Sequence, residues 1–547
     1  MPLATPSKLP RVPLLIAIVC GFSQVLWFSL TCYHGIDYDG MAYLGIARHL
    51  RNGQWHEAIN GFRSPLLPWL IAAATWGDVK PIYVGKIINA GTFLLSTLLL
   101  YLLTWRLWRS EIAASVSALL FVLARGYAAI AIEMITPDFL FAALALCYFV
   151  ILLRCLRGGR LADWVLLGLI HGLAFLAKAF ALPWLALCSL LAAGFSAGGA
   201  RTKLARLGTS ACIPILFAAG WASILHLKYG VYTTGTQFKS NLFQWTLRVH
   251  TNSGAYSLLR DTRDEVDEYF VDDPMPPDSP LWRYTIRVGE TFPKVLQAET
   301  RNIPHALKET AIVITPGGLL AFAISVVFLS ARKREYPIEW RFAVIVFVAA
   351  ISLLVTYSML VFDSRYLFPL TPLLLALAAP FFTRGASFPN YPWRLLCIAL
   401  AVWGAMYSLV YSSSPFRLLV RDFQTSCYAA GNILRTHPRS AVVSIGSGPF
   451  PEHGVGWEAG YKGSFFGDAR IAGALDFLPA SSEMEVLMDD ISKASPDAIL
   501  VWGRPSSPRY VAVLDALSAR YPGSSRTRIG DVALGECGMV LTLRSQN

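Results

Sequence analysis

The sequence predicts a polytopic α-helical membrane protein with a small α/β domain at its carboxyl end. Its 547 residues are 55% hydrophobic and include a further 41 glycines, and the mean hydropathy is +0.48. Charged residues make up only 15% of the chain, against about 25% in soluble domains. This composition excludes a soluble enzyme, a disordered chain and an ordinary nucleic-acid-binding domain. The net charge of +12 comes largely from short loops between apolar runs, which is a signal of membrane topology.

Apolar runs long enough to cross a bilayer recur along the chain. A spanning helix needs about 20 apolar residues, and about eleven such runs are present. The first is too long for the core of a signal peptide and lacks a cleavage site, so we expect it to remain as an anchor. The stretch 161–197 fits either a hairpin of two spans or one broken helix. The expected spans are 12–31, 82–105, 111–131, 137–153, 161–177, 179–197, 207–226, 311–330, 342–361, 367–382 and 395–412.

Basic residues mark one side of the membrane. They gather in alternate loops, all on the side of the amino terminus, and cytoplasmic loops carry such an excess. We therefore expect a multi-pass protein of the inner (plasma) membrane with a cytoplasmic amino terminus and a periplasmic or otherwise extracytoplasmic carboxyl terminus. The basic residues are Arg106, Arg109, Arg154, Arg157, Arg160, Arg201, Lys203, Arg206, Arg332, Lys333, Arg334, Arg341, Arg384 and Arg394.

Three segments remain for the outer face. Residues 32–81 form a first outer loop with helical, half-polar character, and residues 227–310 form a long loop rich in Asp, Pro and aromatic residues. Residues 413–547 have the composition of a water-soluble domain. We therefore expect two domains, a transmembrane module over 1–412 and an extracytoplasmic domain over 413–547.

The predicted extracytoplasmic domain has an α/β pattern. Short apolar runs bounded by Gly and Pro predict strands at 441–447 and 497–503. Between them, 423–437 and 482–494 have the spacing of amphipathic helices. A small α/β domain follows from this alternation.

Ionisable side chains gather at the outer ends of the predicted helices. Charged groups are costly at membrane depth and are usually functional where they occur. Here carboxylates and cations from several hairpins share one membrane level, whereas a pump or channel more often spreads its charges along a path. The residues are Asp37, Asp39, Arg63, Glu133, Asp138, Lys178, Asp363 and Arg365.

This arrangement suits a reaction on a lipid-linked substrate with an anionic head. Lys178, Arg365 and Arg63 are suited to hold a phosphate and to stabilise the charge that develops as it leaves. A carboxylate, Asp39 or Asp37, is suited to accept a proton from the attacking group. Plainer interpretations remain, because Asp readily begins helices and long basic side chains extend to the membrane interface.

Four segments in order resemble motifs of the GT-C superfamily of glycosyltransferases, above all the protein O-mannosyltransferase-like group (family 39) and the aminoarabinose transferases that modify lipid A. The first combines DGMAYLGIAR (39–48) with GFRSPLLPW (61–69). TPDFLF (136–141) resembles a second acidic motif, and GLAFLAK (172–178) a Gly-Leu-x-x-Leu-x-Lys segment. SRYLFPLTP (364–372) resembles an Arg-Tyr…Pro segment.

The resemblance covers about residues 1–412 and implies a GT-C transmembrane catalytic module. It implies an inverting transfer of a hexosyl or pentosyl group from a polyprenyl-phosphate donor to a lipid, glycan or protein acceptor at the outer face. Asp39 matches the family's catalytic Asp, the proposed base. Both branches usually have Glu after this Asp, whereas this chain has Gly40. Asp37 is therefore a second catalytic candidate.

The remaining charged residues receive supporting roles. Lys178, Arg365 and Arg63 are expected to bind the donor phosphate, and Asp138 and Glu133 to orient the acceptor or a metal. No spacing typical of a metal site is present, so no cofactor is certain and a divalent metal stays an open alternative. The rival function is a transporter or lipid flippase with an extracytoplasmic binding domain. Against it stand the lack of an internal repeat and the single level of the charges.

Overall fold

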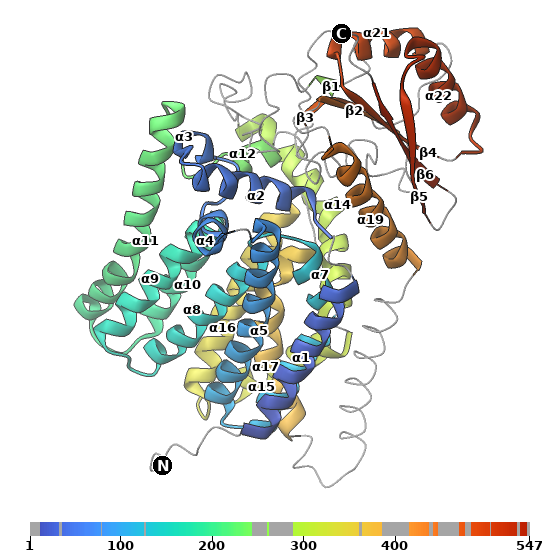
Figure 1. Cartoon of the computed structure of the whole chain (residues 1–547). Coiled ribbons are helices and arrows are strands. Elements are labelled where there is room, and N and C mark those ends of the chain that lie inside the picture. The colour runs from blue at the N-terminus through green and yellow to red at the C-terminus, as the bar shows by residue number, and fades with distance from the viewer. Residues whose placement is uncertain are drawn as a thin grey trace.

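The structure, a computed structural model, comprises a helical bundle and a smaller unit built around a β-sheet (Figure 1). The amino-terminal helix begins at the lower end of the bundle in this view, and the sheet unit lies beyond the opposite end. The structure describes the chain except residues 1–10, 32–34, 78, 125–126, 243–259, 262–287, 315, 360–363, 385–414, 437–440, 447–469, 476–482, 504, 533–535 and 544–547.

Long helices form the bundle, because a helix satisfies its backbone hydrogen bonds internally when water is absent. They are α1 (Arg11–Thr31), α5 (Pro81–Trp108), α6 (Glu111–Val122), α7 (Tyr127–Glu133), α8 (Asp138–Leu156), α9 (Leu161–Ala177), α10 (Ala181–Phe195), α11 (Ala200–Tyr229), α14 (Val288–Ile314), α15 (Pro316–Ala331), α16 (Pro337–Ser358) and α17 (Leu370–Arg384). In α8, 83% of an 18-residue apolar window is buried, against 28% in α11. α8 is therefore the central helix, packed against α5, α9, α10 and α16, and α11 is peripheral.

Four helices in the described part of the chain are long and apolar enough to cross a membrane, namely α5, α8, α11 and α16. A fifth crossing results if the bent pair α6 and α7 is counted as one. Shorter apolar helices lie within α1, α9, α10 and α17. The expected span 395–412 lies outside the described residues, so the predicted number of spans is not confirmed. Each of the other expected ranges contains helix.

The structure adds detail to two of the expected segments. The span expected at 111–131 contains α6 and α7, which meet at a 48° bend and are long and apolar enough to cross a membrane only when they are counted together. Part of the outer loop expected over 227–310 is helical, because α14 begins at Val288. The sequence of α14 is amphipathic but contains Pro293 and Pro304. Because proline disfavours the interior of a helix, the sequence did not predict α14.

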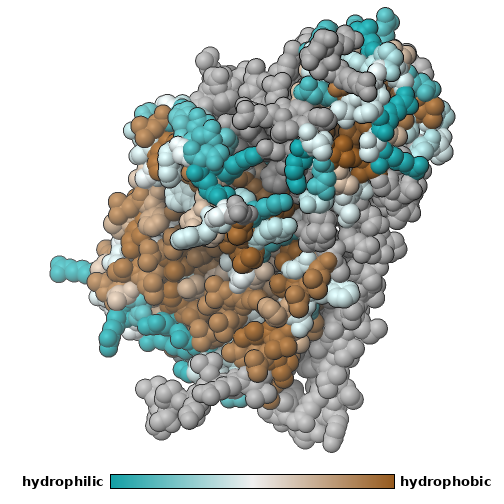
Figure 2. Space-filling view, in the orientation of Figure 1, coloured by the Kyte–Doolittle hydropathy of each residue, from teal (hydrophilic) through white to brown (hydrophobic). Residues whose placement is uncertain are grey.

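The surface of the bundle carries a broad apolar band (Figure 2). Hydrophilic residues lie on either side of this band in the same view. An apolar band between polar ends is what a helical protein needs in a bilayer. Large exposed hydrophobic side chains include Leu15, Ile16, Val19, Phe22, Trp27 and Leu30 on α1 and Leu204, Ile215, Leu216 and Leu227 on α11.

Short helices cover the end of the bundle nearest the sheet unit (Figure 1). They are α2 (Tyr38–Arg51), α3 (Trp55–Ala58), α4 (Leu66–Ala74) and α12 (Gln237–Asn241). α2 is amphipathic and packs against α3, α4 and α5, with Met41, Leu44 and Ala47 fully or almost fully buried. The predicted helical character of residues 32–81 is thus confirmed.

The carboxyl-terminal unit is a six-stranded sheet of order β1-β3-β2-β4-β6-β5 with helices on both faces. Its elements are β1 (Arg260–Asp261), α19 (Pro415–Leu434), β2 (Ala441–Gly446), β3 (Arg470–Leu475), α21 (Met484–Ala494), β4 (Ala498–Gly503), α22 (Pro508–Arg520), β5 (Ser525–Val532) and β6 (Glu536–Thr542). β3, β2 and β4 run parallel, and the other pairs are antiparallel. Val443 and Ile499 face α21 and α22, whereas Val442 and Leu500 face α19.

A strand from the long loop joins this sheet. Arg260 pairs with Ala474 and Asp261 with Gly473, so β1 forms the edge beside β3. The backbone groups of an edge strand are available for such pairing. A segment that the sequence assigns to the transmembrane module therefore contributes to the sheet of the carboxyl-terminal unit.

Candidate functional site

The first acidic motif begins α2. Asp37 precedes this helix, and its Oδ1 accepts a hydrogen bond from the backbone N–H of Gly40 at 3.2 Å, as an N-cap does. The same oxygen accepts a second hydrogen bond from the backbone N–H of Ile135 at 2.9 Å. Ile135 lies just before Asp138 of the second acidic motif. Asp37 thus connects the two segments that carry the acidic motifs.

Asp39, in the first turn of α2, lies between two arginines. Nη1 of Arg63 is 2.7 Å from Oδ1 of Asp39, and Nη1 of Arg365 is 2.9 Å from Oδ2. Arg63 precedes α4, and Arg365 belongs to the 3₁₀ turn Ser364–Leu367. The side chains of Asp39, Arg63 and Arg365 are 21%, 7% and 18% exposed, so water screens these ion pairs weakly.

Local hydrogen bonds hold the turn that carries Arg63. Oδ1 of Asn60 accepts the backbone N–H groups of Phe62 at 2.8 Å and of Arg63 at 2.6 Å. The guanidinium carbon of Arg63 lies 4.6 Å from the centre of the Phe62 ring, a cation–π contact. The backbone N–H of Thr236 donates to the Gly61 carbonyl at 2.7 Å, which ties this turn to the segment after α11.

The two arginines determine the charge state of Asp39. Burial disfavours the charged carboxylate, but Arg63 and Arg365 outweigh burial and lower the pKa of Asp39 to about 2. Asp39 is therefore ionised at any physiological pH and is a weak base while both arginines hold it. Burial raises the pKa of Tyr43, on the same helix, far above its usual value, so this phenol stays neutral.

Lys178 and Asp138 form the second ion pair of the site. Lys178 lies at the break between α9 and α10, and Asp138 begins α8. Their side chains are 11% and 4% exposed. The Lys178 ammonium lies 4.5 Å from the ring centre of Tyr366 and 5.5 Å from that of Tyr357, and the two rings stack at 4.1 Å. Both ions are thus enclosed by protein.

Tyr366 connects the two ion-paired groups. The guanidinium carbon of Arg365 is 5.6 Å from its ring centre, while Lys178 contacts the same ring. The structure therefore brings together residues from four of the predicted outer turns. This cluster consists of Asp39, Arg63, Asp138, Lys178 and Arg365, and we call it the charged cluster.

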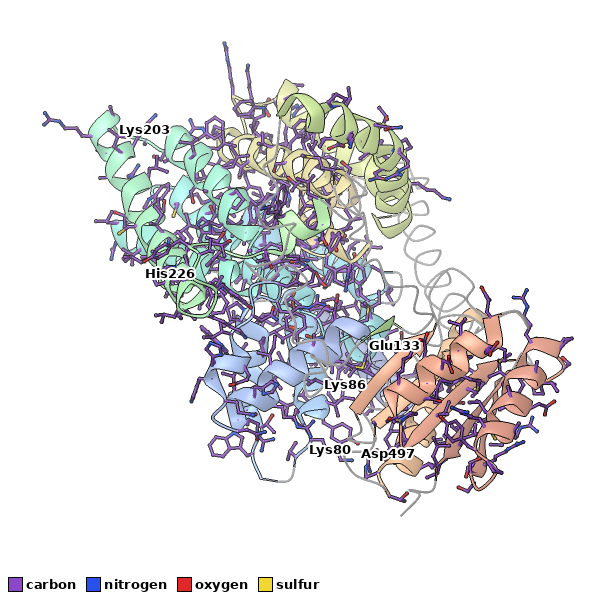
Figure 3. All side chains as sticks on the ribbon, turned by 90° about the horizontal axis from the view of Figure 1, so that it is seen from above. Lys80, Lys86, Glu133, Lys203, His226 and Asp497 are labelled. Atoms are coloured by element: carbon purple, nitrogen blue, oxygen red, sulfur yellow. The ribbon has the colours of Figure 1, made fainter. Side chains whose placement is uncertain are left out.

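Glu133, another of the predicted site residues, is not one of the residues that make up the charged cluster. It is half-buried at the end of α7, and the next residue accepts a hydrogen bond from Nδ2 of Asn89 on α5 at 2.6 Å. Figure 3 labels Glu133 together with Lys86, which also belongs to α5. Asp363 lies outside the described residues.

Two buried ionisable residues, Lys86 and Glu299, were not predicted. Lys86 is 6% exposed, and its place within the apolar run 82–105 is a signal of function that sequence reasoning had available. Glu299 on α14 is 9% exposed and accepts a hydrogen bond from Oγ of Ser358 at the end of α16. No pattern in the sequence indicates this contact, which places α14 beside Tyr357.

A cavity of about 600 Å³ lies beside the charged cluster. Arg63, Lys178 and Tyr366 line one part of its wall. Another part is apolar and comes mainly from the start of α10, with Trp221 from α11. Its main apolar residues are Phe180, Leu182, Trp184, Leu187 and Trp221. The lining of the cavity thus combines positive charge with large apolar side chains.

The residues of the charged cluster do not fit a divalent cation well. Metal ions of this kind prefer several free carboxylate or imidazole ligands. Both oxygens of Asp39 face guanidinium groups, and Asp138 holds an ammonium group. In the described part of the chain, no group of three or more His, Cys, Asp or Glu side chains is placed to hold a metal. We therefore assign no step to a metal.

The packing of α2 explains why Gly40 follows Asp39. A Cβ atom at Gly40 would lie 2.5 Å from Oδ1 of Asp37 and 3.1 Å from Cβ of Ile135. A longer side chain such as Glu would therefore force α2 away from the second acidic motif.

We expect Gly40→Ala to destabilise the protein by about 1–2 kcal/mol through loss of the cap, although Ala normally stabilises a helix relative to Gly. Gly91→Ala in α5 is the control, because a Cβ there meets nothing within 4 Å. Thermal unfolding of both purified variants in detergent tests this. A Gly40→Ala protein as stable as Gly91→Ala would contradict the packing described here.

No family model matches the chain. A curated relative, undecaprenyl phosphate-alpha-4-amino-4-deoxy-L-arabinose arabinosyl transferase 1 of Pseudomonas fluorescens, is 32% identical over 208 residues. The match spans 34% of this chain and only 36% of the relative's length.

Solved structures resemble the chain over almost its whole length. ArnT from Cupriavidus metallidurans bound to undecaprenyl phosphate matches with a TM-score of 0.51 and 14% identity, over 97% of each chain. The oligosaccharyltransferase AglB from Archaeoglobus fulgidus, in complex with an inhibitory peptide and a dolichol-phosphate, matches with a TM-score of 0.51 and 12% identity. That match covers 98% of this chain and 74% of AglB. The chain thus shares the fold of these two proteins.

Proposed function

We propose that this chain is an inverting glycosyltransferase that moves a sugar from a polyprenyl-phosphate donor to a lipid, glycan or protein acceptor at the outer face of the membrane. The observation that carries the proposal is the charged cluster, in which two carboxylates and three cations meet beside a largely apolar cavity. The fold supports it, because ArnT, which shares this fold, binds undecaprenyl phosphate.

A polyprenyl-phosphate donor suits both the charged and the apolar residues that line the cavity. Arg63, Arg365 and Lys178 provide charge-assisted hydrogen bonds for a phosphate, and two of them line the cavity directly. The polyprenyl tail would lie against Trp184 and Trp221, where burial of hydrocarbon is favourable. The phosphate and the tail would thus bind in the same cavity.

The chemical step is a single displacement. A hydroxyl or amino group of the acceptor attacks the anomeric carbon, and the bond from this carbon to the phosphate oxygen breaks. The electron pair of that bond leaves with the polyprenyl phosphate, whose growing charge Arg63 and Arg365 stabilise. Asp39 accepts the acceptor's proton. One bond forms as one breaks, which inverts the anomeric centre.

Asp37, Asp138 and Glu133 would support this step. The two backbone hydrogen bonds of Asp37 favour a positioning role for this residue, because they hold α2 against the segment before Asp138. Asp138 would position Lys178, with which it pairs. Glu133 stays a candidate for orienting the acceptor.

The orientation in the membrane follows from the same proposal. The charged cluster would face the outer compartment together with α2 and the carboxyl-terminal sheet unit, which lie at one end of the bundle (Figure 1). The amino terminus would then be cytoplasmic, as the basic loops predict. The transmembrane module would cover 1–412 and the extracytoplasmic domain 413–547, joined by β1.

Purified protein incubated with a panel of radiolabelled polyprenyl-phosphate sugars tests the function. We expect one donor to be consumed, with release of polyprenyl phosphate and label on a lipid A, glycan or peptide acceptor. Asp39→Asn protein is the matched control and should leave the label on the donor. Failure to consume any donor, combined with movement of the lipid across reconstituted vesicles, would instead favour a transporter or flippase.

A further inference from the structure

The carboxylate of Asp39 is the counter-ion of Arg63 and Arg365, the two arginines that we propose as ligands of the donor phosphate. Each carboxylate oxygen of Asp39 faces one guanidinium group, at 2.7 Å from Arg63 and 2.9 Å from Arg365. A carboxylate held in this way is a poor proton acceptor, because both oxygens are stabilised in the charged form. The proposed reaction nevertheless needs Asp39 as a base and the same arginines as phosphate ligands. Asp39 can therefore act as the base only if it first leaves the two arginines.

We propose that Asp39 is the resident occupant of an anion site formed by Arg63 and Arg365, and that the phosphate of the donor lipid replaces it there. The exchange would release the carboxylate toward the acceptor only when the donor is bound. This inference rests on the proposed function and describes how its site is regulated.

Charge balance favours replacement of Asp39 by the phosphate over binding of the phosphate beside Asp39. Two guanidinium groups that are only 7% and 18% exposed need an anion beside them, because an unpaired charge in such a place is costly. The donor phosphodiester carries one negative charge, so it can replace one carboxylate without leaving the arginines unpaired. As the sugar leaves, the phosphate gains further charge, and the arginines then bind it more strongly than they bind a carboxylate.

The second ion pair is arranged to stay in place. The side chain of Asp138 is 4% exposed, against 21% for Asp39. Its partner Lys178 is fixed against the stacked rings of Tyr357 and Tyr366. Exchange at Asp39 therefore disturbs less of the surrounding structure than exchange at Asp138.

The exchange has a kinetic consequence. Without the donor, Asp39 remains with the arginines and cannot activate an acceptor or a water molecule. The donor must therefore bind before the acceptor is activated.

Binding of undecaprenyl phosphate, the product form of such a donor, tests the exchange without any need for catalysis. Asp39→Asn removes the competing charge and keeps the shape, so we expect this variant to bind the lipid about tenfold more tightly, or ~1.4 kcal/mol. Asp163→Asn is the matched control, because Asp163 pairs with Arg154 at 2.7 Å at the far end of α8 from Asp138. Its affinity should equal that of the wild type. Asp39→Ser, which removes the same charge, is measured beside them in case the Asn variant does not fold.

The outcomes separate this inference from the proposed function. Tighter binding by the Asp39 variants alone supports the exchange. Equal or weaker binding by folded Asp39 variants, with a wild type that binds, overturns the exchange and leaves the proposed function intact. No binding of undecaprenyl phosphate by any protein overturns both. Inorganic phosphate forms a second arm: a similar gain with it means that the phosphate group alone displaces Asp39, and a gain with the lipid only means that the lipid headgroup is required.

Discussion

Replacing Asp39 by Asn is expected to lower the rate of sugar transfer by about 10²–10⁴-fold, the usual contribution of a general base. The amide has the same shape but cannot accept the acceptor's proton. Because the variant also removes the competing negative charge beside Arg63 and Arg365, KM for the donor should fall together with kcat. Steady-state kinetics with the donor identified in the panel would measure both constants.

The combination of lower kcat and lower KM distinguishes a base from a purely structural residue. Loss of a purely structural residue would raise KM for the donor instead of lowering it. Asp163→Asn again serves as the control, since it removes a carboxylate from an ion pair with Arg154 and should leave both constants unchanged. An Asp39→Asn enzyme with the wild-type rate would refute the assignment of the base.

Replacing Lys178 by Met is expected to affect both activity and stability. Transfer should fall by about 10²–10³-fold, because one phosphate ligand is lost. The free energy of unfolding should fall by about 3–5 kcal/mol, because Asp138, 4% exposed, is left as a buried charge without its partner. Transfer assays and thermal unfolding in detergent measure the two effects.

A double variant separates these two effects. Lys178→Met combined with Asp138→Asn removes both charges, so we expect most of the stability to return while transfer stays low. Asp138→Asn alone shows how much of the activity depends on the positioning of Lys178. Recovery of full activity in the double variant would exclude Lys178 as a phosphate ligand.

The sequence predicted the parts of the fold that depend on local pattern. Apolar runs predicted the bundle helices, and the short runs at 441–447 and 497–503 predicted β2 and β4. It missed what depends on tertiary contacts. The two residues of β1 are too few to carry a strand pattern, and they pair only because β3 offers an edge. The division of 111–131 into α6 and α7 likewise does not follow from hydropathy.

The same distinction holds for the site. Charged side chains are costly at membrane depth, and this singled out Asp39, Arg63, Asp138 and Lys178 in the sequence. The structure brings these residues together. Which cation pairs with which carboxylate could not be predicted, because these residues come from different turns. The hydrogen bond between Asp37 and Ile135 also needs two segments to meet, so Asp37 stayed a second candidate for the base beside Asp39.

A structure of the protein determined with undecaprenyl phosphate tests the central claim most directly. We expect the phosphate to lie within hydrogen-bonding distance of Arg63 and Arg365 and near Lys178, with the tail against Trp184 and Trp221. Density for the phosphate at another place, out of reach of all three cations, would contradict the account.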